Sequence, residues 1–124
     1  MNLTVKNIHQ INIALLAPSE GEVIIADLPS ALDLIMTAKY EASASRIALP
    51  KSAVADPFFV LSSGLAGEIL QKYINYGVKL AIYGDYSHYT SKPLKDFIYE
   101  SNQGRDFFFV ATEAEALLRL STAL

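Results

Sequence analysis

The chain contains no cysteine and only two histidines, and these shortages exclude several kinds of chemistry. Without cysteine there is no disulfide, no catalytic thiolate and no sulfur-rich zinc site. His9 and His88 are far apart and lack metal-ligand spacing, so we expect no metal site. Phosphate-binding glycine patterns are also absent, and we expect no bound cofactor.

Long apolar runs and a strong net charge are missing as well. The longest apolar runs, such as residues 13–17, are far shorter than the roughly 20 residues that span a bilayer. The first residues lack the pattern of a secretory signal peptide. A net charge of −3 and a pI near 5.3 provide no field that would attract nucleic acid. We therefore predict a cytoplasmic protein that binds neither membranes nor nucleic acid.

The residues that are present indicate a folded domain. Of the 124 residues, 52% are hydrophobic and 19% are charged, which excludes a disordered chain. This length fits one core, so we expect a single domain over residues 1–124.

Strand-like and helix-like patterns alternate along the chain. The strands are expected at residues 8–16, 22–26, 45–49, 78–83 and 106–111, and the helices at residues 64–76, 91–104 and 112–121, with an earlier one that starts after Asp27. Met36 and Ile74 are placed on the apolar faces of their helices. The order β-β-α-β-α-β-α-β-α predicts an α/β fold with one mixed, largely parallel sheet, an N-terminal antiparallel hairpin and about four helices.

Several residues are suited to helix ends. Asp27, Ser91 and Thr112 can each cap the start of a helix, since their side chains accept a hydrogen bond from a free main-chain N–H. Glu115 completes a capping-box pattern with Thr112. Gly77 is placed to end the second helix in the left-handed conformation.

A run of sequence segments carries a resemblance to a known family. The segments are residues 56–59 (DPFF), 63–76 (SGLAGEILQKYINY), 79–86 (KLAIYGDY) and 97–104 (FIYESNQG). In these segments the chain resembles family 4180 of the domains of unknown function, found mainly in bacteria. The resemblance covers most of the chain from Asp27 onward and implies no particular activity.

A looser similarity concerns residues 59–65, FVLSSGL. This stretch is similar to the Asp-Ser-Ser-Gly-Leu stretch of STAS domains, the fold of anti-sigma factor antagonists. The order of elements agrees with that fold. In that family a partner kinase phosphorylates the serine after the aspartate, which corresponds to Ser62, while Leu61 replaces the aspartate. The resemblance implies a non-enzymatic regulatory or protein-interaction module, with Ser62 or Ser63 as candidate phosphorylation sites.

The residues themselves suggest an alternative at the carboxyl edge of the sheet, where α/β folds place their sites. Asp85, Tyr86 and His88 follow one parallel strand, and Ser62 is expected to follow its neighbour. Ser62, Asp85 and His88 are the ingredients of nucleophilic hydrolysis. The alternative function is therefore a small-ligand-binding or hydrolytic domain. The simpler interpretation is that a serine caps the following helix and that Asp85 shapes its loop.

Two further surfaces are candidates for interaction. Glu68, Gln71, Lys72 and Asn75 form one polar stripe on a helix, which is either a solvated face or a docking surface. Glu100 lies near the end of the next helix as a candidate pocket residue. Tyr83, Tyr86 and Tyr89, in and after the preceding strand, are candidates for an exposed aromatic patch. We consider a protein partner, and also a homodimer built on an exposed helix or strand edge.

Overall fold

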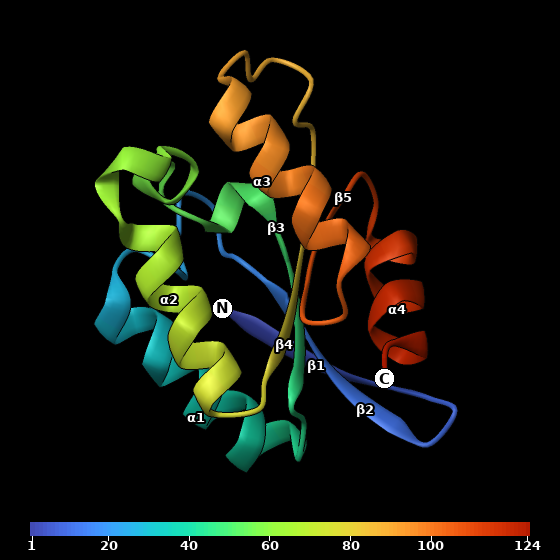
Figure 1. Cartoon of the computed structure of the whole chain (residues 1–124). Helices are drawn as coiled ribbons and strands as arrows, with labels where there is room; N and C mark the ends of the chain where they lie inside the picture. The colour runs from blue at the N-terminus through green and yellow to red at the C-terminus, as the bar shows by residue number, and fades with distance from the viewer.

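The computed structural model describes residues 1–124 as one mixed sheet flanked by helices (Figure 1). The sheet has the order β1-β2-β3-β4-β5, with β1 antiparallel to β2 and the other pairs parallel. Its strands are β1 (Asn2–Ile8), β2 (Ile11–Ala17), β3 (Arg46–Pro50), β4 (Lys79–Tyr83) and β5 (Phe107–Val110), and the helices are α1 (Leu28–Ala42), α2 (Leu65–Asn75), α3 (Lys92–Gln103) and α4 (Glu113–Thr122). The predicted fold class and order of elements are confirmed.

The position of the hairpin was predicted wrongly. Its strands are β1 and β2, and the turn between them is His9-Gln10, with φ of 52° and 68°. Both turn residues are left-handed, the conformation of a two-residue hairpin turn that is usually built with asparagine and glycine. Residues 22–26 form no strand. Ile25 makes only an isolated bridge to Val54, and in this connection between β2 and α1 only Ile24 and Ile25 are buried.

The two faces of the sheet are covered unequally. α1, α2 and α3 pack on one face and α4 on the other (Figure 1). Side chains alternate along β2, so that Ala14 and Leu16 join the larger core of 25 residues while Ile13 joins the smaller core of seven. The three crossovers between parallel strands place α1, α2 and α3 on the same face, whereas α4 follows the last strand. The return of α4 to the opposite face is what buries both sides of β3 and β4.

The helix ends agree in most respects with the predictions. Asp27 caps α1, and its side chain and that of Ser30 satisfy each other's main-chain N–H groups. Gly77 has φ of 69° after α2, as predicted. Thr112 accepts a hydrogen bond from the N–H of Glu115 at 3.2 Å, which is one half of the predicted capping box.

Two apolar residues lie outside the faces predicted for them. Met36 is exposed on α1, and Leu34 is buried instead. Ile74 is exposed on α2, whereas Tyr73 is buried and donates a hydrogen bond from its hydroxyl to the carbonyl of Ala31 at 2.8 Å. Burial raises the pKa of Tyr73 far above its ordinary value. The periodicity predicted where each helix lies. Because α1 and α2 also pack on each other, their contact determines which of these residues are buried.

No helix of the structure is long and apolar enough to cross a membrane.

Candidate functional site

An open hollow lies at the carboxyl ends of β3 and β4. We call it the carboxyl-edge hollow. It has a volume of about 440 Å³, and its lining residues are Pro50, Lys51, Ser52, Tyr83, Gly84, Asp85 and His88. The carboxyl ends of parallel strands are where α/β folds place their ligands. The hollow therefore lies where the topology predicts a site.

Gly84 allows the ends of the two strands to come this close. A Cβ added at Gly84 would lie 2.7 Å from the Cβ of Lys51, far inside van der Waals contact. Any larger residue would push the segment after β3 away from the segment after β4. The glycine thus sets the width of the hollow.

An aromatic cluster supports the rim. Phe59 stacks on Tyr89 with ring centroids 5.6 Å apart, and Tyr86 packs edge-on against Phe109 at 6.0 Å. The hydroxyl of Tyr86 donates to the carbonyl of Ile82 at 2.7 Å, and burial raises the pKa of Tyr86 far above its ordinary value. The predicted exposed aromatic patch is therefore wrong for Tyr86, which is held inside the loop as a structural residue.

Lys51 is the cation of the hollow. Its Nζ lies 4.8 Å from the ring centroid of Tyr89 and 5.2 Å from that of Phe59. Such cation–π contacts contribute about 0.5–2 kcal/mol each and fix where the ammonium group lies. Lys51 forms no ion pair with any carboxylate. Its charge is therefore positioned by rings and remains available to an anion.

Asp85 shapes the loop that carries His88. Its Oδ1 accepts a hydrogen bond from the main-chain N–H of Ser87 at 2.8 Å. Hydrogen bonds from the Ser87 side chain and main chain, with smaller effects of the His88 and Lys51 charges, hold the pKa of Asp85 below its ordinary value. The carboxylate is thus ionised and already engaged.

His88 is exposed, and its ring lies 4.3 Å from that of Tyr89. Ser52 lies in the same hollow, but no hydrogen bond joins Ser52, His88 and Asp85. Sequence reasoning missed both Lys51 and Ser52, although they directly follow β3 and so share the carboxyl edge with Asp85. Their place after a buried parallel strand was the signal.

Ser62 lines a different hollow, of about 360 Å³, together with Phe59, Ser91 and Pro93. The structure therefore does not group Ser62 with Asp85 and His88. Ser62 is exposed and its side chain makes no hydrogen bond, so its hydroxyl is accessible.

Ser63 is engaged in the start of α2. Its hydroxyl donates to the carbonyl of Pro57 at 2.7 Å and accepts from the N–H of Leu65 at 3.2 Å. The N-cap residue itself is Gly64, with φ of 78° and no side chain to cap with. The expected serine cap is thus partly supplied by Ser63, one residue earlier than an N-cap.

The polar stripe of α2 is fully exposed and lines no hollow. The side-chain amide of Gln71 donates to Asn75 at 3.1 Å, while Glu68 and Lys72 form no ion pair. Glu100 is also exposed and lines no hollow. These residues have the geometry of solvated helix faces.

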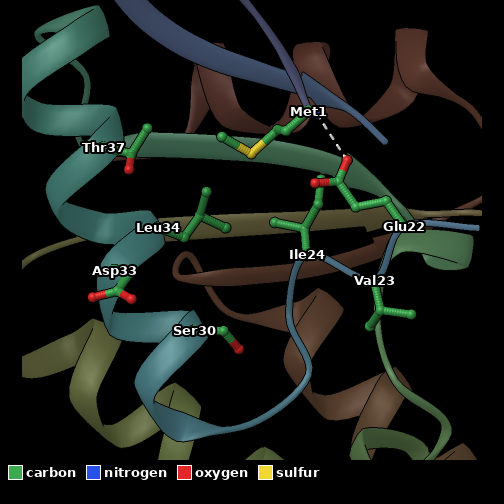
Figure 2. A pocket seen from close by; sticks show the side chains of 8 residues that line it. All are labelled: Met1, Glu22, Val23, Ile24, Ser30, Asp33, Leu34 and Thr37. Atoms are coloured by element: carbon green, nitrogen blue, oxygen red, sulfur yellow. Dashed lines mark ion pairs between the residues drawn. The ribbon is translucent and has the colours of Figure 1, made fainter. Parts of the chain in front are cut away.

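A third hollow lies beside α1 and was not predicted. Figure 2 shows Met1 reaching toward Leu34 and Thr37 of α1, above Ile24 of the β2–α1 connection. The volume is about 220 Å³. The terminal ammonium of Met1 pairs with Glu22 at 2.9 Å, the ion pair drawn in Figure 2. Nearby, no group of three or more acidic or histidine side chains converges as metal ligands would, here or elsewhere in the chain.

Comparison with protein families matches residues 10–120 to Domain of unknown function (DUF4180). The chain belongs to this family. The match covers α1 to β5 completely and includes β2, so the resemblance carried by residues 56–104 extends over nearly the whole fold. No curated protein and no solved structure matches the chain. The description of this family names no activity, and the carboxyl-edge hollow is the feature of the structure that best indicates one.

Proposed function

We propose that this DUF4180 domain is a non-enzymatic interaction module that binds an acidic side chain of a protein partner in the carboxyl-edge hollow. The observation that carries the proposal is the ammonium of Lys51, held over Phe59 and Tyr89 without a carboxylate partner. Because this ammonium group is already held in place, the side chain loses little conformational entropy when it binds an anion, which favours recognition. His88 and Ser52 add hydrogen-bond donors to the same hollow.

The hydrogen bonds among the residues of the hollow favour binding over catalysis. A nucleophile and its base must lie within hydrogen-bond reach, and the base must be oriented by a third group. Here Asp85 is occupied by the N–H of Ser87 and does not orient His88 through a hydrogen bond. The hollow supplies a positive charge and hydrogen-bond donors, but its nucleophile, base and carboxylate are not joined by hydrogen bonds.

A regulatory role of the STAS type is part of the proposal. It is supported by the similarity of residues 59–65 to the STAS stretch and by the accessible hydroxyl of Ser62 just before α2. A phosphate on Ser62 would lie near the free N–H groups at the start of α2. The cytoplasmic location expected from the sequence stays a prediction.

Titration of the ¹⁵N-labelled protein with a short blocked peptide rich in aspartate and glutamate tests the proposal. We expect the amide signals of Ser52, Gly84 and His88 to shift. Lys51→Met keeps the length and the ring contacts but removes the charge, and should weaken binding about tenfold or more. Lys72→Met on α2 is the matched control and should bind normally. Shifts that persist unchanged in Lys51→Met, or that occur only along α2, would contradict the proposal.

A partner from the native cell lysate can then be assigned to the hollow. Cross-linking followed by mass spectrometry should recover a protein with the wild type and with Lys72→Met, but not with Lys51→Met. The same spectra report whether Ser62 is phosphorylated.

Hydrolysis is a second candidate, supported by Ser52 rather than Ser62. Ser52 shares the hollow with Asp85 and His88, and hydrogen bonds between catalytic groups often tighten only when the substrate binds. An activated serine would be labelled by a fluorophosphonate probe. Labelling of Ser52 that disappears in His88→Ala would replace the interaction proposal with a hydrolytic one.

A further inference from the structure

β1 is an edge strand of seven residues whose outer side is uncovered. Its principal packing partner is β2 alone. Ile8 and Ile11 flank the two-residue turn, and in such hairpins the flanking residues form a hydrogen-bonded pair. Hydrogen-bonded pairs then alternate, so Thr4 and Lys6 bond to β2. The main-chain groups that point away from the sheet belong to Leu3, Val5 and Asn7, and no loop or side chain bonds to them.

The opposite edge of the sheet is closed. The side-chain amide of Asn102 donates to the carbonyl of Phe109 at 3.0 Å and accepts from its N–H at 2.8 Å. It thereby bonds both main-chain groups of Phe109, in the middle of this short strand, as a further strand would. Arg119 packs over the ring of Phe108 and donates to the carbonyl of Asn102, which holds the amide in place. β1 is therefore the edge available for strand pairing.

We propose that β1 pairs antiparallel with β1 of a second copy of this chain, with Val5 opposite Val5 across a two-fold axis. In this register Leu3 lies opposite Asn7 of the second copy, so every outward main-chain group of these residues gains a partner. Because β5 is closed, the pairing joins an edge only to itself. Such an isologous contact gives a dimer and not an open fibre.

The side chains of β1 fit this register. Lys6 is the only charged residue of the strand, and it lies opposite Thr4 of the second copy, so no like charges face each other directly. Val5, which is 43% exposed in the single chain, meets its own copy at the axis. A register centred on Lys6 would oppose two ammonium groups and would require main-chain groups that β2 already uses.

The hairpin turn reaches the hollow of Figure 2 in this arrangement. In this register Leu3 lies opposite Asn7 of the second copy. Two residues further along, Met1 lies opposite His9 of the second copy. Glu22 and Asp33 line that hollow and supply carboxylates that can accept a hydrogen bond from the ring N–H of His9. Val23, which is 45% exposed at the same hollow, would be covered by the incoming turn.

Cysteine cross-linking tests the register, because the chain has no cysteine of its own. Opposite residues in a hydrogen-bonded antiparallel pair have Cα atoms about 5.5 Å apart, within the range of a disulfide. Val5→Cys should therefore give a covalent dimer under mild oxidation. Asn7→Cys is the matched control on the same side of β1, where the two thiols would be offset by about 14 Å and should not react. Equal cross-linking of both variants, or of neither, would overturn the proposal.

Sedimentation of the unmodified protein provides a second measurement. We expect a concentration-dependent dimer, unchanged by Lys51→Met because the carboxyl-edge hollow is separate. Val5→Pro removes an outward N–H and leaves the ladder to β2 intact, so it should fold and weaken the dimer at least about tenfold. Val5→Thr keeps the N–H and should still dimerise. A wild type that stays monomeric at the concentrations used for NMR would refute the inference.

Discussion

The two edges of the sheet differ in length, cover and hydrogen bonding. β5 has four residues and packs between α3 and α4, and the main-chain N–H and carbonyl of its Phe109 are bonded to Asn102. β1 has seven residues, no helix over its outer side and free main-chain groups. Natural sheets usually shorten, cover or charge an exposed edge, because it is a template for another strand. Here β5 is both shortened and covered, whereas β1 has only the charge of Lys6.

The difference follows from where the helices lie. β3 and β4 are buried on both faces and β2 still packs against α1 and α4, while β1 extends the sheet beyond these helices. The carboxyl-edge hollow is built on the buried strands, so its lining is fixed by the core. The proposed dimer contact uses the part of the sheet that the core leaves open. Recognition and self-association are therefore assigned to different halves of the molecule.

The largest expected effect is on the free energy of unfolding, and it compares a substitution in the central strand β4 with one in the edge strand β1. Leu80 is 1% exposed in β4, and Leu80→Ala should lower the free energy of unfolding by about 2–5 kcal/mol. Val5→Ala on β1 should change it by no more than about 0.5 kcal/mol in dilute protein, since Val5 contributes to no buried cluster. Urea unfolding followed by circular dichroism measures both. Equal losses would mean that the hairpin is integral to the core.

An intermediate effect is expected where β5 is closed. Asn102→Ala leaves the N–H and carbonyl of Phe109 without their partner and should cost about 1–3 kcal/mol in unfolding free energy. Gln103→Ala, at an exposed neighbouring position, is the control. The variant should also associate more readily, because the second edge is opened. If stability and association stay as in the wild type, Asn102 does not protect the edge.

The smallest effect concerns α1, the helix nearest the open edge, and its dependence on pH. Hydrogen bonds from the main chain and side chain of Ser30 hold the pKa of Asp27 below its ordinary value of 3.8. A lowered folded-state pKa gives stability that is present above the unfolded value and is lost as pH falls through the folded value. The melting temperature of Asp27→Ala should therefore approach that of the wild type as pH falls below about 4. Melting curves across this range measure the gap, and a gap independent of pH would show that the ionised carboxylate is not what caps α1.

Much of the fold could be predicted because its signals are local. Asp27, Ser91 and Gly77 act within one helical turn of their own position, and the apolar runs at β4 and β5 mark strands covered on both faces. The hairpin was misplaced because His9 and Gln10 are not residues that favour a left-handed turn. The site was predicted in part: Asp85 and His88 were expected at the carboxyl edge, but Lys51 and Ser52 were not among the predicted site residues.

The sequence by itself determined the alternation of strands and helices, since periodicity and capping are properties of neighbouring residues. Only the tertiary structure decided which side chains share a hollow and which edge of the sheet is open. Lys51 reaches Phe59 and Tyr89 because Gly84 lets two strand ends approach, and Asn102 meets Phe109 because α3 packs along β5. These contacts depend on the distance between separate elements, which no local pattern of residues encodes.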